Sequence, residues 1–196
     1  VIALTGVFVG MVLAVQAYAQ FAGTGFTGRM GAVVNVTVIS ELGPVLAAIM
    51  LAGRVGGALT AELGTMKVTE QVDALEAMGV NPLRYLVAPR FMACLLMIPF
   101  LTIIADLAGV LGGYLVSCYT FGVNSHEYWR YSAEYIRTWD HVTGLGKSFF
   151  FGGAIGLISC YKGFTTKGGA QGVGRACTEA FVSSFIAILM LDFFLS

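Results

Sequence analysis

Charged side chains are scarce in this sequence. Only 11% of the 196 residues are charged, and the eleven Lys and Arg residues balance the eleven Asp and Glu residues. A soluble domain carries about 25% charged residues, so this chain has too few polar side chains to cover a soluble fold. It also lacks the excess of basic residues that would hold nucleic acid. We therefore expect an integral membrane protein with no nucleic-acid partner.

Motifs that carry common chemistry are also absent from the sequence. The four cysteines are scattered without a CxxC pair, and we interpret them as small apolar residues rather than a metal or redox site. There is no nucleophile elbow, Walker A loop, HExxH motif or dinucleotide-binding fingerprint. A metal site formed by His126, Glu127 and His141 is the alternative left open. We expect no catalytic residue, no metal site and no enzyme activity in the chain itself.

Long apolar runs indicate where the chain crosses the membrane. Residues 1–28 contain no charge, and 91–119 contain only Asp106. A helix needs about 20 apolar residues to span the hydrocarbon core. We expect an all-α integral membrane protein with a single transmembrane domain over 1–196. Its five spans are predicted at about 1–22, 33–59, 91–119, 147–162 and 177–195.

The loops between these spans differ in charge. Seven of the eleven Lys and Arg residues lie in or beside the second and fourth loops, and four lie in or beside the first and third. The positive-inside rule therefore places the second and fourth loops in the cytoplasm and the C-terminus outside. Lys147 and Lys162 flank the fourth span, and we expect both side chains to extend to the membrane interfaces. The glycine-rich stretch 23–32 predicts a tight turn.

The second loop contains an amphipathic pattern at 65–79. Val68, Val72 and Leu75 share one side of a helix with 3.6 residues per turn, and Gly79 is placed to end it. Its charged residues are mostly acidic, which disfavours binding to anionic lipid headgroups. We interpret the segment as a docking helix for another protein, the alternative being a connector packed against the span ends.

The third loop, residues 122–142, predicts a second amphipathic helix. Asn124 followed by Glu127 resembles a capping box at a helix start. The segment is rich in Tyr and Trp, which gather where a membrane meets water. We expect it to lie at the outer interface.

Several residues within the spans are unusual for an apolar environment. Pro44 removes a backbone hydrogen bond one turn earlier, next to Glu41, so a carboxylate is expected beside a loosened turn lining a cavity. The alternative is that Glu41 and Arg54 lie near opposite membrane surfaces. Gln16 and Gln20 lie on one face of the first span and predict hydrogen bonds between helices or a partly wet cavity.

Glycines spaced four apart suggest close contacts between helices. Gly6 with Gly10, and Gly53 with Gly57, are the two pairs in which we expect neighbouring helices to approach.

A family resemblance is carried by the stretch from Glu41 to Pro82, which reads ELGPVLAAIMLAGRVG at 41–56 and AELGTMKVTEQVDALEAMGVNP at 61–82. It resembles the MlaE/YrbE family, permease subunits of bacterial ABC systems that move phospholipids, with relatives in chloroplast envelopes. The stretches GVFVGMVLAVQAY at 6–18 and LDFF at 191–194 extend the likeness over essentially the whole chain. Asn81 stands where the family often has Asp.

The resemblance implies a five-span permease that moves phospholipid and acts as a homodimer in the bacterial inner membrane. Two cytoplasmic ABC ATPase subunits would bind ATP and Mg, so that this chain needs no cofactor. The helix at 65–79 would be the coupling helix that docks into the ATPase, and an MCE-domain lipid-binding protein would act on the outer side. We expect the family's N-terminal membrane-lying helix to lie outside these 196 residues.

The resemblance also assigns roles to individual residues. The expected substrate-binding residues are Leu13, Gln16, Gln20, Phe21, Glu41 and Leu42. The expected ATPase-coupling residues are Met66, Lys67, Glu70, Gln71, Asp73, Glu76 and Met78. Pro44, Arg54 and Glu62 are assigned structural roles.

Two points stay open from the sequence. Glu41 can face an ammonium headgroup, pair with an arginine of a second protomer, or act at a hinge. Acidic residues near or within spans, namely Glu41, Asp106 and Asp192, also suit a stand-alone channel or an ion-coupled secondary transporter. A membrane scaffold without transport activity is a third reading.

Overall fold

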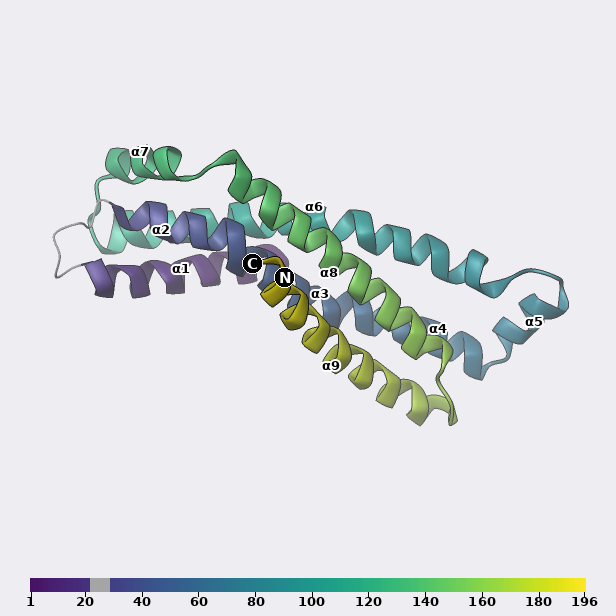
Figure 1. Cartoon of the computed structure of the whole chain (residues 1–196). Coiled ribbons are helices and arrows are strands. Elements are labelled where there is room, and N and C mark those ends of the chain that lie inside the picture. The colour runs from purple at the N-terminus through teal and green to yellow at the C-terminus, as the bar shows by residue number, and fades with distance from the viewer. Residues whose placement is uncertain (22–28) are drawn as a thin grey trace. The chain divides into compact units, whose positions relative to one another are not determined.

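The computed structural model describes residues 1–21 and 29–196 (Figure 1). These residues form helices and contain no strand. Five helical stretches are long and apolar enough to cross a membrane: Ile2–Phe21, Met30–Val68, Leu83–Thr120, Thr138–Phe164 and Gly169–Leu195. The prediction of an all-α protein with about five transmembrane helices is confirmed. Most of the turn expected at 23–32, and residue 22 of the first expected span, lie outside the described residues.

Three of the five stretches are single α-helices, and the other two combine α-helices with π-helical turns, which are labelled η. The first stretch is α1 (Ile2–Phe21). The second contains α2 (Met30–Thr37), η2 (Val38–Leu42), α3 (Gly43–Leu51), η3 (Ala52–Gly56) and α4 (Gly57–Val68), and is followed by the short α5 (Gln71–Ala77). The third contains η4 (Leu83–Val87), α6 (Ala88–Leu115) and η5 (Val116–Thr120). The last three helices are α7 (Ser125–Tyr135), α8 (Thr138–Phe164) and α9 (Gly169–Leu195).

The wide turn η2 has a cause that is visible in the sequence. Pro44 has no N–H group to donate to the preceding turn. Just before it, the Gly43 N–H donates to the Val38 carbonyl, five residues back, instead of four as in an α-helix. The predicted loosening of the helix next to Glu41 is therefore confirmed.

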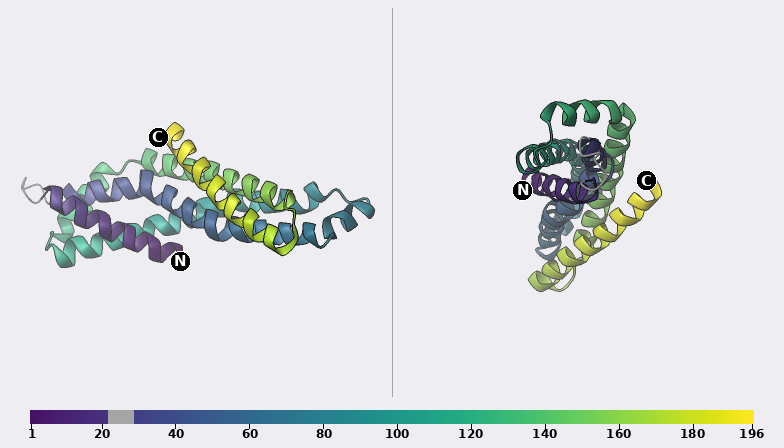
Figure 2. Two further views of the ribbon diagram at one scale, coloured as in Figure 1. Left: turned by 90° about the horizontal axis from the view of Figure 1, so that it is seen from below. Right: turned by 90° about the vertical axis from the view of Figure 1, so that its left-hand side faces the viewer.

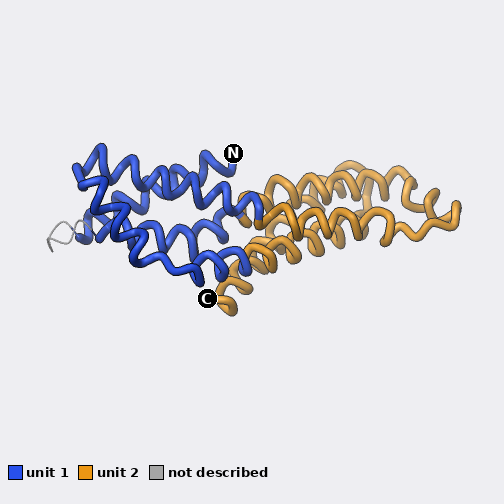
Figure 3. The backbone as a smooth tube through the Cα atoms, turned by 90° about the horizontal axis from the view of Figure 1, so that it is seen from above, with its two compact units in different colours: residues 1–47, 100–147 blue, residues 48–99, 148–196 orange. Residues whose placement is uncertain are grey.

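The described residues divide into two compact units (Figure 3), the first formed by Val1–Ala47 and Phe100–Lys147. In this unit α1 packs beside α2, and α7 packs against α2 on another side. The buried core between α1 and α2 consists of Ala14, Ala17, Met30, Val34 and Val38. Small residues on α1 allow this close packing, because alanine side chains leave little space between helix backbones.

Glycines bring α1 into backbone contact with α6 in the first unit. A Cβ atom added to Gly10 would collide with the Gly109 carbonyl oxygen, and one added to Gly6 would lie 2.5 Å from the Ala105 carbonyl oxygen. The predicted close contact at Gly6 and Gly10 is confirmed. At Gly53 and Gly57 the neighbouring helix is α9, and it approaches less closely. The Cys177 thiol donates to the Gly57 carbonyl at 3.5 Å, and a Cβ atom on Gly53 would make only an ordinary contact. A Cβ atom on Gly57 would meet no atom of the described residues within 4 Å.

A buried hydrogen-bonded cluster joins α7 to α2. The Tyr128 hydroxyl donates to Asn35 Oδ1 at 2.9 Å, and Asn35 Nδ2 donates to Ser132 Oγ at 2.8 Å. The Ser132 hydroxyl donates in turn to the Tyr128 carbonyl at 2.7 Å. Burial raises the pKa of the Tyr128 phenol, which therefore stays a neutral donor. As expected, α7 begins after Asn124, whose side chain accepts a hydrogen bond from the His126 N–H.

The second unit is formed by Ala48–Pro99 and Ser148–Ser196. In it α9 lies beside α4, as Figures 1 and 2 show. A core of Leu63, Val72, Leu86 and Cys160 joins α4, α5, η4 and α8. The Thr60 hydroxyl on α4 lies 3.1 Å from the Ser159 carbonyl oxygen on α8. This core also holds α5 against the end of α4, because Val72 belongs to it.

We expect Gly10→Ala and Gly57→Ala to change stability in opposite directions. Alanine favours a helix over glycine by about 0.5–1 kcal/mol, and at Gly57 it meets nothing within 4 Å. At Gly10 the same methyl group meets the Gly109 carbonyl, and overpacking costs about 1–3 kcal/mol. The free energy of unfolding in a denaturing-detergent titration should rise for Gly57→Ala and fall for Gly10→Ala. Equal changes in both variants would contradict the α1–α6 contact.

We also expect Tyr128→Phe to destabilise the protein by about 1–3 kcal/mol, because Asn35 Oδ1 loses its donor in a buried site. Tyr131→Phe is the matched control, since Tyr131 lies one turn further along α7 and is half-buried. Thermal unfolding midpoints of the two variants in the same detergent measure the difference. A Tyr128→Phe variant as stable as the control would show that the cluster contributes nothing.

Candidate functional site

An apolar groove of about 330 Å³ lies in the first unit between α1 and the η2–α3 region. It is lined by Phe8, Val9, Val12, Leu13, Gln16, Leu42 and Leu46. Three of the predicted substrate-binding residues, Leu13, Gln16 and Leu42, therefore meet at one surface. Gln16 is the only one of the lining residues that can form side-chain hydrogen bonds. The groove offers an apolar wall with a single polar position.

Phe21 and Gln20 lie elsewhere on α1. Phe21 lines a separate cavity of about 490 Å³ in the same unit, together with Arg29, Tyr135, Arg137, Asp140 and residues of α2. Gln20 is exposed and belongs to neither lining. The structure thus brings together three of the six predicted residues and places Phe21 in a different cavity.

Glu41 forms an ion pair with Lys147. Lys147 Nζ lies 2.6 Å from Glu41 Oε2, and the Lys147 side chain is 4% exposed, whereas that of Glu41 is 40% exposed. The expectation that Lys147 extends to a membrane interface is therefore wrong. An ammonium group in an apolar environment is costly unless it is paired. This ion pair within the same chain was not among the three roles left open for Glu41.

The wide turn η2 makes room for this pair. A Cβ atom on Gly144 would collide with the Ile39 carbonyl oxygen, so glycine lets α8 approach the η2 backbone closely. Lys147 lies one turn beyond Gly144 on the same helix, which brings its ammonium group to Glu41. Sequence reasoning missed Lys147 because it lies 106 residues from Glu41, and no local pattern connects them.

Asp106 packs against the same region from α6. Its Oδ1 atom touches Gly43, where a Cβ atom would collide with it. Oδ1 is buried and has no hydrogen-bond partner among the described residues. Glycine at position 43 therefore leaves the space that the Asp106 carboxyl group fills.

The single helix expected at 65–79 is not observed, and this prediction is wrong. The chain forms the end of α4, a break at Thr69 and Glu70, and the separate helix α5. Glu70 adopts a left-handed backbone conformation with φ of 59°. Gly79, which also has a positive φ, follows α5, as the sequence predicted for a helix end.

The break has an identifiable physical basis. The Thr65 and Thr69 hydroxyls donate to the carbonyls of Ala61 and Thr65, a local bonding pattern that bends helices. After the break, Lys67 Nζ reaches Asp73 Oδ1 at 2.6 Å. Residues six apart do not face each other on a straight helix, so the break allows this ion pair.

The predicted coupling residues divide between an exposed surface and a packed interior. Met66 packs against the core of the second unit, and Lys67 and Glu76 line a cavity of about 630 Å³ next to the turn at Pro82. The remaining members are exposed: Glu70, Gln71, Asp73 and Met78. Apart from Lys67, the charged residues of this surface are acidic.

Glu62 pairs with Arg90, a residue not considered as its partner from the sequence. Arg90 Nη2 lies 2.7 Å from Glu62 Oε1 and joins α4 to α6 within the second unit. Arg54 lies in η3 and is exposed. The pairing of Glu62 with Arg90 spans 28 residues, so no helical spacing could have indicated it.

Within 1–21 and 29–196, His, Cys, Asp and Glu side chains form no group of three or more that could hold a metal ion. The alternative site of His126, Glu127 and His141 thus gains no support from these residues.

A protein-family model and several known proteins are similar to this sequence over its whole length. The family model described as Permease MlaE covers residues 1–196. A probable ABC transporter permease protein of Rickettsia typhi is 44% identical over 196 residues, which are all of this chain and 76% of that protein. The intermembrane phospholipid transport system permease protein MlaE of Haemophilus influenzae is 38% identical over 197 positions, covering all of this chain and 76% of that protein.

A plant protein is also similar. The chloroplastic protein trigalactosyldiacylglycerol 1 of Arabidopsis thaliana is 40% identical over 193 residues, which are 98% of this chain and 55% of the plant protein. The full-length family match and the five apolar helices agree with each other. The chain is a multi-pass membrane protein and belongs to the MlaE permease family.

Proposed function

We propose that this chain is the permease subunit of an ABC transporter that moves phospholipids between membranes, using ATP hydrolysis by a separate ATPase subunit. The observation that carries the proposal is the apolar groove on α1, in which Leu13, Gln16 and Leu42 meet. The name of the Haemophilus relative supports phospholipid transport, and the name of the Rickettsia relative supports a permease of an ABC transporter. The chain supplies a path for the lipid and has no catalytic site of its own.

The groove suits the acyl chains of a lipid. Its lining is almost wholly apolar, and lipid sites combine such a wall with a few polar groups for the head. Gln16 supplies one polar contact. Glu41 directly precedes Leu42, which lines the groove. Because the positive charge of Lys147 balances the Glu41 carboxylate, a phosphate group in the groove would be repelled less than by an unpaired carboxylate.

The groove of one chain covers only part of a two-tailed lipid, which supports a homodimer. At about 330 Å³ it lies at the lower end of sites for small ligands, about 300–1,000 Å³. Leu4, Phe8 and Val12 lie four residues apart along α1, and each is more than half exposed. A second copy packed against this face would complete the wall around the lipid.

The segment from Lys67 to Met78 is proposed to dock into the cytoplasmic ATPase, which binds ATP and Mg. Its exposed acidic side chains fit a basic protein surface better than anionic lipid. The Lys67–Asp73 ion pair and buried Val72 tie this segment to α4. A movement imposed on the segment by the ATPase would therefore be transmitted to α4.

The remaining parts of the proposal concern the surroundings of the chain. We place it in the bacterial inner membrane with the second and fourth loops in the cytoplasm, following the distribution of Lys and Arg. An MCE-domain protein on the outer side would exchange lipid with the groove. Closure of the ATPases would change the shape of the shared cavity and move the lipid.

Variants of the Glu41–Lys147 pair should separate stability from transport. We expect Glu41→Gln to lower the free energy of unfolding by about 3 kcal/mol, because it removes the carboxylate charge that lies 2.6 Å from the buried Lys147 ammonium group. The double variant Glu41→Gln with Lys147→Met should recover most of this stability, because both charges are removed together, and its rate of lipid transfer shows whether the two charges also contribute to transport. Unfolding titrations and transfer of labelled lipid between vesicles by the complex with its ATPase measure the two effects.

The matched control is the more exposed pair Glu62–Arg90. Glu62→Gln should cost about 1 kcal/mol or less, as is usual for exposed pairs, and should leave lipid transfer intact. If the stable double variant at positions 41 and 147 transported lipid at the normal rate, the pair would have only a structural role.

Charge reversal should test the docking surface. We expect Glu70→Lys with Glu76→Lys to weaken binding of the ATPase subunit at least about tenfold, because like charges would meet across the contact. Co-purification of the ATPase and ATP hydrolysis by the reconstituted complex should both fall.

The control variant carries the same change of charge on α7, as Glu127→Lys with Glu134→Lys. It should bind the ATPase normally, since α7 is assigned to the outer side. Normal hydrolysis and co-purification in the Glu70 and Glu76 variant would remove the proposed coupling role.

A further inference from the structure

A basic pocket lies where α8 ends and α9 begins, in the second unit. It has a volume of about 240 Å³ and is lined by Lys162, Thr165, Thr166, Lys167, Gly172, Arg175, Ala176 and Glu179. Three of these residues are basic and one is acidic, which leaves an excess of two positive charges. None of them belongs to the groove or to the coupling surface described above.

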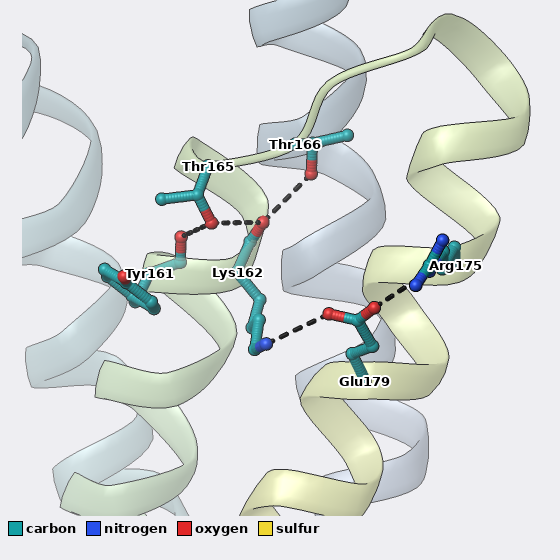
Figure 4. A network of polar contacts seen from close by, with 6 residues as sticks. All are labelled: Tyr161, Lys162, Thr165, Thr166, Arg175 and Glu179. Atoms are coloured by element: carbon teal, nitrogen blue, oxygen red, sulfur yellow. Dashed lines mark hydrogen bonds and ion pairs between the residues drawn. The ribbon is translucent and has the colours of Figure 1, made fainter.

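The pocket is built around one carboxylate. Glu179 accepts hydrogen bonds from Lys162 Nζ and Arg175 Nε, each at 3.0 Å, as Figure 4 shows. These contacts hold the two cationic groups on either side of the Glu179 carboxylate. The Arg175 side chain is 83% exposed, so most of its guanidinium group stays accessible to a ligand.

The hydroxyl groups in the pocket are not available to donate hydrogen bonds to an anion. Thr166 donates to the Lys162 carbonyl at 2.9 Å, and Thr165 donates to the Tyr161 carbonyl at the same distance. Their hydrogens are therefore engaged by the backbone. Recognition of an anion depends on the side chains of Lys162, Lys167 and Arg175.

The surface beyond the pocket is apolar. On α9, Val182, Ile186 and Met190 follow Arg175 and Glu179 at spacings that place all five on one stripe of the helix. These three side chains are 47%, 52% and 59% exposed. A charged pocket at the end of a membrane-spanning helix, followed by an exposed apolar stripe, matches the division of a phospholipid into head and tails.

We propose that this pocket binds the phosphate headgroup of an anionic phospholipid of the surrounding membrane, whose acyl chains lie along the stripe on α9. The bound lipid would be a resident of the leaflet and distinct from transported cargo. It would link α8 to α9 by bridging Lys162, Lys167 and Arg175. This inference does not depend on the proposed transport of lipid.

Retention of defined lipids by the full chain tests the proposal. The protein is exchanged into nanodiscs of phosphatidylcholine with phosphatidylglycerol, and native mass spectrometry counts the lipids that stay bound. We expect the unaltered chain to retain phosphatidylglycerol in preference to phosphatidylcholine. Each basic residue lost should weaken binding about fivefold, so Lys167→Gln with Arg175→Gln should abolish most of the preference.

Two further variants sharpen the test. Arg84→Gln with Arg130→Gln removes the same charge from exposed sites outside the pocket and should keep the preference. Glu179→Gln removes the acidic residue of the pocket and should raise retention of phosphatidylglycerol, because the excess of positive charge increases. A gain in one variant and a loss in another cannot both come from general unfolding.

Four outcomes would overturn the proposal. The first is equal retention of phosphatidylglycerol in the Lys167 and Arg175 variant and its control. The second is equal retention of both lipids by the unaltered chain. The third is full displacement of the lipid by millimolar inorganic phosphate, which would indicate a site for a free anion. The fourth is loss of ATPase co-purification in the variant with unchanged lipid retention, which would assign the pocket to a protein contact.

Discussion

A helix that crosses a membrane must satisfy its own backbone hydrogen bonds, and Pro44 prevents this in the second span. The chain responds with the wide turn η2, in which the Gly43 N–H bonds five residues back. Gly43 and Gly144 let α6 and α8 approach this turn. The Glu41–Lys147 ion pair and the buried Asp106 carboxyl group of the first unit therefore lie around this one wide helix turn.

Features that depend on local chemistry were predictable from the sequence. The scarcity of charged residues predicted a membrane protein, and the long apolar runs predicted five transmembrane helices. Both predictions work because a segment surrounded by lipid must be apolar over the thickness of the membrane. Pro44 predicted the loosened turn, and Asn124 predicted the start of α7. Leu13 and Gln16 lie one turn apart on α1, so their common surface in the groove also follows from helix geometry.

Features that depend on distant partners were not predictable. Lys147 flanks an apolar run, a position that is typical of a lysine at a membrane interface. It pairs with Glu41 instead because α8 approaches η2 closely. The amphipathic pattern at 65–79 did not predict the break at Glu70. Val72, which follows the break, is buried in a core with Leu63 on α4, and this contact between separate helices is not visible in the local sequence. Arg90 was missed for the same reason, since its partner lies on another helix.

The glycine contact between α1 and α6 has a consequence for how the groove can change shape. Where Gly10 meets Gly109, backbone touches backbone, and no layer of side chains lies between the two helices. Side chains can change rotamer to let helices slide, whereas backbones in direct contact cannot. Within the first unit, α1 and this part of α6 therefore behave as one rigid wall. The groove can widen or narrow only on its other side, where Leu42 and Leu46 follow the wide turn at Pro44.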